Sequence, residues 1–252
     1  MSTKTESWQR HGLFENKPFL MTVLVTVLIS IGGLVEMIPL AAVKSNVPTI
    51  AEVTPYTPLE LEGRDIYLRE GCYNCHSQMI RPFRAETMRY GEYSRAGEFV
   101  YDHPFQWGSK RTGPDLARLG GKYPDAWHYR HMENPVATSA GSIMPRYPWL
   151  LEDTLDFALT QRKMKAMALM GVPYSKKQIA DGKHEARQQA KEIVANLAQA
   201  DIETTWDTEI VALIAYLQRL GVDGKRAFAD GGDGSSDAAP APAGAPAGGT
   251  HE

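Results

Sequence analysis

The two cysteines of the chain lie three positions apart and are followed at once by a histidine. Residues 71–82 read GCYNCHSQMIRP, and the other 250 residues contain no cysteine. Two thiols cannot build a disulfide framework, but they could form one disulfide, a dithiol redox pair, part of a metal site or a covalent attachment point. The neighbouring histidine and the rest of the chain must decide between these kinds of chemistry.

Cys72-Tyr73-Asn74-Cys75-His76 has the spacing of a c-type haem attachment site. Each thiol can add across one vinyl group of haem b, and the histidine that follows can then face the iron. A zinc site needs four ligands, and no second Cys or His cluster has suitable spacing. A thioredoxin-like pair would follow a strand, whereas the residues before Cys72 favour a helix. We therefore expect one covalent haem c, attached through Cys72 and Cys75 and ligated by His76.

A six-coordinate haem iron needs a second axial ligand, whereas an open position would indicate gas binding or catalysis. Met144 lies in SAGSIMPRYPWL, a Gly/Pro-containing loop far enough along the chain to fold back over the haem. Met79 is too near His76 to reach the opposite face of the iron. We expect Met144 to be the distal ligand and the haem to carry electrons. The other candidates are Met88, Met132, His103, His128 and His131.

An apolar segment near the N-terminus is long enough to cross a bilayer. It reads FLMTVLVTVLISIGGLVEMIPLAAV over residues 19–43 and carries no charge from Phe19 to Val35. A helix over residues 19–40 would be about 33 Å long. The run exceeds the apolar region of a signal peptide and no clear cleavage site follows it, which favours a retained anchor over a cleaved signal. Basic residues concentrate before the segment, so the positive-inside rule predicts a cytoplasmic N-terminus.

Composition divides the chain around these two features. The net charge of −3 gives no basic footprint for nucleic acid. After Gly221 the sequence becomes rich in Ala, Pro and Gly, which cannot bury enough apolar surface to become ordered. We expect an N-terminus at 1–18, an anchor at 19–43, a linker at 44–58, a haem domain at 59–221 with insertions at about 77–112 and 151–204, and a disordered tail at 222–252.

The haem domain is expected to be mainly α-helical. Apolar periodicity and terminal residues predict its helices, and Ser175 with Gln178 forms a candidate capping box. Residues 77–150 show little periodicity and favour loops. The predicted helices cover residues 59–71, 154–170, 175–200 and 207–220.

Two long strings in the sequence resemble the monohaem cytochrome c subunit II of cbb3-type cytochrome c oxidases, the CcoO/FixO family. These strings are MIRPFRAETMRYGEYSRAGEFVYDHPFQWGSKRTGPDLARLGGKYPDAWHYRHMENP and SIMPRYPWL. GGLVEMIPL and GVPYS match the same family, and the resemblance covers roughly residues 8–220. It implies a mainly α fold, with one N-terminal transmembrane helix and a class I cytochrome c-like haem domain. One departure is the long polar segment DGKHEARQQAKEIVANLAQADIET, whose role is open.

The resemblance also implies roles for particular residues. Cys72 and Cys75 would be the thioether sites, His76 the proximal ligand and Met144 the distal ligand. GPDL at residues 113–116 resembles the Gly-Pro-x-Leu loop of class I cytochromes c, so the Pro114 carbonyl would accept the ring N–H of the haem histidine.

Two further features lie outside the motif. Gly63 and Tyr67 would cross tightly against Tyr216 and Leu217, as in class I cytochromes c. Arg81 could pair with a haem propionate, and the alternative is an ordinary surface ion pair.

The implied function is electron transfer inside a membrane oxidase. The family's partners are a catalytic haem–copper subunit, which reduces oxygen, and a dihaem cytochrome c subunit. Electrons from that dihaem subunit or a soluble cytochrome c would cross this haem to haem b, and this chain would have no catalytic residue. The implied setting is the bacterial inner membrane, with a periplasmic haem domain, lipid around the anchor and residues 77–112 as the subunit contact. Alternatives are a haem sensor or peroxidase-like enzyme, a stand-alone anchored carrier and a subunit of a nitric oxide reductase-like complex.

Overall fold

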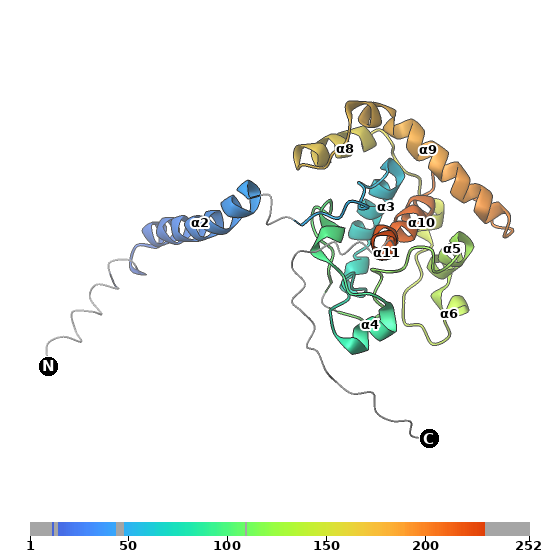
Figure 1. Cartoon of the computed structure of the whole chain (residues 1–252), viewed down its shortest axis with the longest axis horizontal. Helices are drawn as coiled ribbons and strands as arrows, with labels where there is room; N and C mark the ends of the chain where they lie inside the picture. The colour runs from blue at the N-terminus through green and yellow to red at the C-terminus, as the bar shows by residue number, and fades with distance from the viewer. Residues whose placement is uncertain (1–11, 13–14, 44–47, 109, 230–252) are drawn as a thin grey trace, which may run out of the picture. The chain divides into compact units, whose positions relative to one another are not determined.

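The computed structural model describes residues 12, 15–43, 48–108 and 110–229. It divides into two units, Met1–Pro48 and Thr49–Glu252, and each is described by itself (Figure 1). The expected N-terminus at 1–18 and the expected linker at 44–58 therefore fall partly outside the described residues, as does the tail from residue 230.

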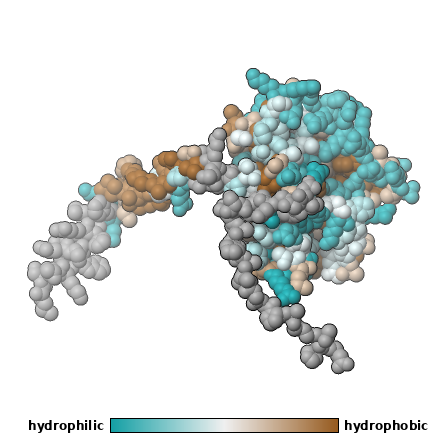
Figure 2. All heavy atoms as spheres, viewed as in Figure 1, coloured by the Kyte–Doolittle hydropathy of each residue, from teal (hydrophilic) through white to brown (hydrophobic). Residues whose placement is uncertain are grey.

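The first unit is dominated by helix α2, Pro18–Ala42. Pro18 occupies the first turn, where its missing N–H costs nothing. The stretch Pro18–Leu40 is long and apolar enough to cross a membrane, and its side chains are exposed (Figure 2). The hydroxyls of Thr22, Thr26 and Ser30 donate to backbone carbonyls four residues earlier, at 2.9, 2.8 and 2.7 Å. These polar groups are satisfied within the helix, as an apolar surrounding requires.

The second unit is helical and loop-rich. The described residues contain no β-strand, only an isolated bridge between Thr154 and Thr208. The region expected to be loops, residues 77–150, also contains helices, namely α4 Arg84–Tyr90, η3 Ala96–Phe99, α5 Asp125–Glu133 and α6 Pro135–Thr138. The helices are α3 Pro58–Arg69, η2 Cys72–Asn74, α4 Arg84–Tyr90, η3 Ala96–Phe99, α5 Asp125–Glu133, α6 Pro135–Thr138, α7 Trp149–Glu152, α8 Thr160–Leu169, α9 Lys176–Ala198, α10 Glu209–Arg219 and α11 Val222–Ala229.

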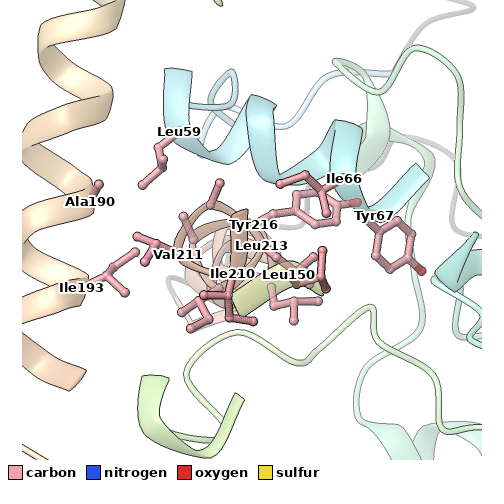
Figure 3. Close-up of a cluster of buried hydrophobic side chains, with 14 of the residues drawn as sticks. Leu59, Ile66, Tyr67, Leu150, Ala190, Ile193, Ile210, Val211, Leu213 and Tyr216 are labelled. Atoms are coloured by element: carbon pink, nitrogen blue, oxygen red, sulfur yellow. The ribbon is translucent and has the colours of Figure 1, made fainter. Parts of the chain in front are cut away.

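The core forms where α3 crosses α10 (Figure 3). A Cβ at Gly63 would collide with the Ala212 carbonyl and would lie 2.9 Å from the Tyr216 Cβ. The rings of Tyr67 and Tyr216 lie 5.3 Å apart. The predicted crossing of Gly63 and Tyr67 against Tyr216 is thus confirmed, and it fixes the end of α3 from which the cysteine motif emerges.

Helix α9 packs against this core with a stripe of buried side chains that includes Ala190 and Ile193 (Figure 3). The predicted capping box at its start is present, because Ser175 Oγ accepts the Gln178 N–H at 3.2 Å and the Gln178 side chain accepts the Ser175 N–H at 2.9 Å. The polar segment that departs from the resemblance is therefore largely a well-capped helix.

The prediction of a helix from Thr154 was wrong for residues 154–159, because α8 begins only at Thr160. The Leu155 N–H donates to the Asp207 carbonyl at 2.8 Å, and Glu209 N–H donates to the Asp153 carbonyl at 3.0 Å. The Asp153 carbonyl, which would have been the first acceptor of such a helix, is used by Glu209, and both bonds hold this segment to the residues at the start of α10. A local pattern contains no information about such a partner.

The prediction that disorder begins at residue 222 was also wrong, because Val222–Ala229 forms α11. The buried Asp223 carboxylate accepts the Thr54 N–H at 2.9 Å and pairs with Arg219. Ala227 packs against Ile50 and Val53, which precede α3 in sequence. Contacts with this earlier segment stabilise α11, which the local composition did not predict.

Candidate functional site

The cysteine motif forms a tight turn directly after α3. Gly71 has φ of +69°, and the turn η2 follows at Cys72–Asn74. The Cys72 carbonyl accepts both the Cys75 N–H at 3.1 Å and the His76 N–H at 2.9 Å. The turn therefore places two thiols and one imidazole within five consecutive residues of compact backbone.

Both cysteines are free thiols in different surroundings. Cys72 is half-buried against the core, whereas Cys75 is exposed. Burial raises the pKa of the Cys72 thiol to about 12, so this thiol is protonated at neutral pH. A dithiol redox pair needs a thiol whose pKa is lowered, which is the opposite environment.

The imidazole of His76 is oriented by a backbone carbonyl. Its Nδ1 lies 2.8 Å from the Pro114 oxygen, which is the contact that the resemblance implies. A carbonyl only accepts, so Nδ1 must donate and Nε2 keeps its lone pair. A Cβ at Gly113 would overlap the ring and would lie 2.7 Å from Nδ1 and 2.8 Å from Nε2. Only glycine lets this loop approach the imidazole so closely.

Backbone hydrogen bonds hold this loop to the motif. Gly113 N–H donates to the Cys75 carbonyl at 3.0 Å, and Leu116 N–H donates to the Ser77 carbonyl at 2.8 Å. Gly108, with φ of +64°, approaches from another side, where a Cβ would lie 2.9 Å from the His76 oxygen. Residues 108 and 113–116 thus enclose the backbone around His76.

A polar network lies behind the loop. Ser77 Oγ donates to Asp115 at 2.6 Å and accepts from Arg111 Nε at 2.7 Å. Arg111 Nη2 also donates to Glu86 at 2.7 Å and to the Met79 carbonyl at 2.9 Å. Hydrogen bonds from Arg111 and from Arg81 lower the pKa of Glu86 to about 2. These contacts therefore connect Arg111 and Asp115 of the loop to Ser77, Met79 and Glu86, which follow His76 in the chain.

Arg81 pairs with Glu86 in the structure. Its backbone N–H donates to the Glu86 carboxylate at 2.9 Å and its guanidinium forms an ion pair with the same group. The side chain is 56% exposed. This is the surface pairing that was the alternative for Arg81, and its role toward a propionate stays a prediction.

Met144 lies in a loop attached to α5. It is half-buried and packs against the same apolar cluster as Cys72. Its N–H donates to Ser142 Oγ at 3.2 Å. Farther along, Tyr147 N–H donates to the Met132 carbonyl at 2.9 Å and Arg146 Nε donates to the Glu133 carbonyl at 2.8 Å. The loop is fixed mainly by its backbone, and the role of Met144 as a ligand stays a prediction.

The competing distal candidates occupy varied environments. Met88 is 76% exposed, whereas His128 is almost completely buried. Burial lowers the pKa of His128 to about 4. His131 Nδ1 lies 2.5 Å from Thr138 Oγ1, and its ring stacks on Trp127 at 4.5 Å.

Sequence reasoning missed the residues that support the histidine. The GPDL string contains Gly113 and Asp115, but the sequence did not show that Gly113 must lack a side chain or that the Asp115 carboxylate binds Ser77. Arg111 carried no sequence signal, since its partners lie 4 to 34 residues away. Among the described residues, no group of three or more His, Cys, Asp or Glu side chains could hold a bare metal ion. The donor set instead fits a haem, with two free thiols and one oriented imidazole.

Comparison with known proteins identifies a family. The family model described as cytochrome c oxidase, mono-heme subunit/FixO, matches residues 11–223, which is most of the chain. No curated protein matches the sequence.

Proposed function

The chain belongs to the family of cytochrome c oxidase mono-haem subunits, and we propose that it binds its haem covalently and relays electrons through it. The observation that carries this proposal is the His76 geometry. Its Nδ1 is engaged by Pro114 at 2.8 Å, which leaves Nε2 free for an iron, and two free thiols lie within four residues. Iron in a bound haem would supply reversible one-electron exchange.

The chain's own residues would attach and orient the group. Cys72 and Cys75 would hold a haem by adding their S–H groups across its two vinyl groups, so that each sulfur would bond to one vinyl carbon and its hydrogen would go to the neighbouring carbon. The high pKa of the half-buried Cys72 thiol would keep that hydrogen in place until the addition. His76 Nε2 and Met144 Sδ are the proposed axial ligands, and the Pro114 carbonyl raises the basicity of the imidazole.

The proposed electron path runs from a dihaem cytochrome c subunit, or a soluble cytochrome c, to haem b of the catalytic haem–copper subunit. With both axial positions filled, the iron offers no vacancy for oxygen, so this chain is not the catalyst by itself. Exposed aromatic side chains beside the motif support a docking role for residues 77–112. Phe105 and Trp107 stack at 5.2 Å, and the Trp107 carbonyl accepts the Gln78 N–H at 2.7 Å.

The proposed location is the bacterial inner membrane. Helix α2 is the single span, the N-terminus is cytoplasmic and the haem domain is periplasmic. The length and composition of α2 support the span, and the basic residues before it support the orientation.

The direct test is a denaturing gel of the full chain, matured in cells that attach haem c, followed by a haem peroxidase stain. We expect the stain at the position of the polypeptide. Replacing both thiols (Cys72→Ser with Cys75→Ser) should abolish it, whereas the matched pair Ser139→Ala with Ser142→Ala should not. Porphyrin that migrates free of the wild-type chain would overturn the covalent proposal.

The relay proposal has its own test in a tagged chain purified in mild detergent. We expect haem b and the catalytic subunit to copurify. Deleting part of residues 83–105 should release the complex and leave haem on the chain. Full retention of the catalytic subunit after this deletion would contradict the proposed contact.

A further inference from the structure

The turn between α8 and α9 carries a concentration of positive charge. Residues 157–180 contain five basic residues and no acidic one, although the chain as a whole has a net charge of −3. One of the five, Lys163, pairs with Glu62 and Asp65. The other four lie on α8 and in the first turn of α9, and two exposed apolar side chains lie between them in the sequence. We call this surface the basic tip, and it consists of Arg162, Lys165, Leu169, Met170, Lys176 and Lys177.

The two apolar side chains of the basic tip are exposed, whereas other side chains of the same segment are buried. Leu169 is 90% exposed, the largest value among the large apolar side chains that the structure describes, and Met170 is 51% exposed. Met164, Met167 and Val172, from the same helix and the turn after it, belong to a buried cluster. Val172 N–H donates to the Met167 carbonyl at 3.1 Å, which closes the turn. Leu169 is therefore held outward by packed structure.

The cations of the basic tip have no acidic partner among the described residues. Lys176 and Lys177 occupy the first turn of α9, which contains no acidic residue. A helix N-terminus already carries partial positive charge, so cations there reduce helix stability. On α8, Arg162, Lys165 and Leu169 follow the i, i+3, i+7 spacing and share its exposed face. The arrangement costs local stability and concentrates positive potential beside an exposed leucine.

The basic tip lies where the chain enters the haem domain. Helices α8 and α9 pack on each other and on α3 (Figure 1). Tyr174 Oη donates to the Tyr56 carbonyl at 2.6 Å, and Tyr56 packs with the cluster beneath the tip. Only residues 43–55 separate Tyr56 from the end of α2, and such a stretch reaches at most about 45 Å. A bilayer crossed by α2 is thus within reach of this side of the domain.

We propose that the basic tip docks on the surface of a membrane that contains anionic phospholipids. Leu169 and Met170 enter the interface between headgroups and acyl chains, and the four cations contact headgroup phosphates. A protein partner fits less well, because a stable interface buries about 800 Å² on each side and this apolar surface is two side chains wide. The inference rests on the proposed membrane anchor.

The test uses the full chain with its haem in lipid nanodiscs, made either of phosphatidylcholine alone or of phosphatidylcholine with phosphatidylglycerol. Hydrogen exchange of backbone amides, read by mass spectrometry, reports on peptides that cover residues 165–178. We expect exchange there to slow by at least about fivefold in the anionic discs, the factor that a single cation at an anionic surface provides. The triple variant Lys165→Glu, Lys176→Glu and Lys177→Glu should lose this difference.

Two further variants separate charge from apolar contact. Leu169→Glu with Met170→Glu should also lose the protection. Lys183→Glu with Lys191→Glu alters two exposed lysines of α9 that lie outside the basic tip. This variant should keep the protection. A chain retained in both discs with equal exchange would overturn the inference and leave the anchor intact. Protection that appears only in the assembled oxidase, whatever the lipid charge, would also overturn it and assign the surface to a protein contact. Loss of the chain from the discs would overturn the anchor and this inference together.

Discussion

His76 and Met144 are proposed for the same iron, yet the structure holds them by different means. The His76 ring has a fixed hydrogen bond to Pro114 at 2.8 Å and lies against Gly113, which leaves no room for a side chain. The Met144 side chain is half-buried, and only its backbone N–H has a hydrogen bond, at 3.2 Å to Ser142. The histidine is oriented by its surroundings, whereas the methionine is positioned by the loop that carries it.

This difference suggests an order of assembly. The histidine side is formed by contacts that need no haem, because Arg111, Asp115 and Ser77 already connect its two loops. A methionine side chain has three rotatable bonds and a polarisable sulfur, so it adapts to a partner that arrives late. The site would therefore bind iron first on a rigid side and then close over it on an adaptable one.

The largest expected effect comes from filling the space beside the His76 ring. In Gly113→Ala the new Cβ would overlap the imidazole, so we expect haem bound per chain to fall by about 10- to 100-fold. The control is Gly141→Ala in the Met144 loop, where φ is +77° and no atom lies within 4 Å of the new Cβ. That change should cost about 1 kcal/mol of folding free energy and leave haem content unchanged. The measurement is the haem stain relative to the amount of protein. Equal losses of haem in both variants would contradict the difference between the histidine side and the methionine side.

The second effect separates attachment from ligation. Met144→Ala should keep the covalent haem but open one axial position, so the reduced protein should bind carbon monoxide. The wild-type protein should bind little. Met88→Ala, at an exposed position on α4, is the control and should behave as wild type. Strong carbon monoxide binding by the wild-type chain would contradict six-coordinate iron and favour a displaceable ligand.

The third effect is a pH dependence on the methionine side. His128 lies on α5, the helix that also anchors the Met144 loop through the Met132 carbonyl. Burial lowers the pKa of His128 from 6.5 to about 4, so the unfolded chain takes up a proton in this range and the folded chain does not. Folding stability is therefore fully present above pH 6.5 and falls by about 3 kcal/mol as the pH drops to about 4.

Urea unfolding at several pH values checks this expectation. His128→Leu should flatten the decline between pH 6.5 and 4, whereas His184→Leu, which alters an exposed histidine on α9, should not. The same decline in both variants would assign the acid sensitivity to another group. Glu86, on the histidine side, has a pKa lowered to about 2, so its stabilisation is lost only at more acidic pH. The two sides should thus loosen in separate pH ranges.

The features that the sequence predicted well are those with a local signature. The apolar helix α2 and the capping box of α9 depend on residues within a few positions of one another. Gly63 and Tyr67 were placed correctly because the family resemblance supplied their distant partner on α10. Local pattern and resemblance together therefore gave the helix crossing and the position of the motif.

The features that the sequence missed depend on partners far along the chain. Helix α11 requires Asp223 to accept from Thr54, which lies 169 residues away. Residues 154–159 lie outside α8, and the Asp207 carbonyl accepts the Leu155 N–H. Arg111 connects groups that precede it by up to 34 residues. Composition and periodicity describe only neighbouring residues, so they could not predict these three features.

The smallest expected effect tests whether the Arg111 network acts on the histidine at all. Arg111→Met should loosen the loop, weaken the Nδ1–H bond to Pro114 and make the imidazole a weaker donor to iron. A weaker donor favours the reduced state, so we expect the reduction potential to rise by less than about 59 mV, which is a tenfold change for one electron. Arg89→Met is the matched control, because Arg89 and Arg111 both lie over the Tyr90 ring, at 5.2 and 5.0 Å. A potentiometric titration that moves equally in both variants, or downward in Arg111→Met, would show that the network does not set the donor strength of His76.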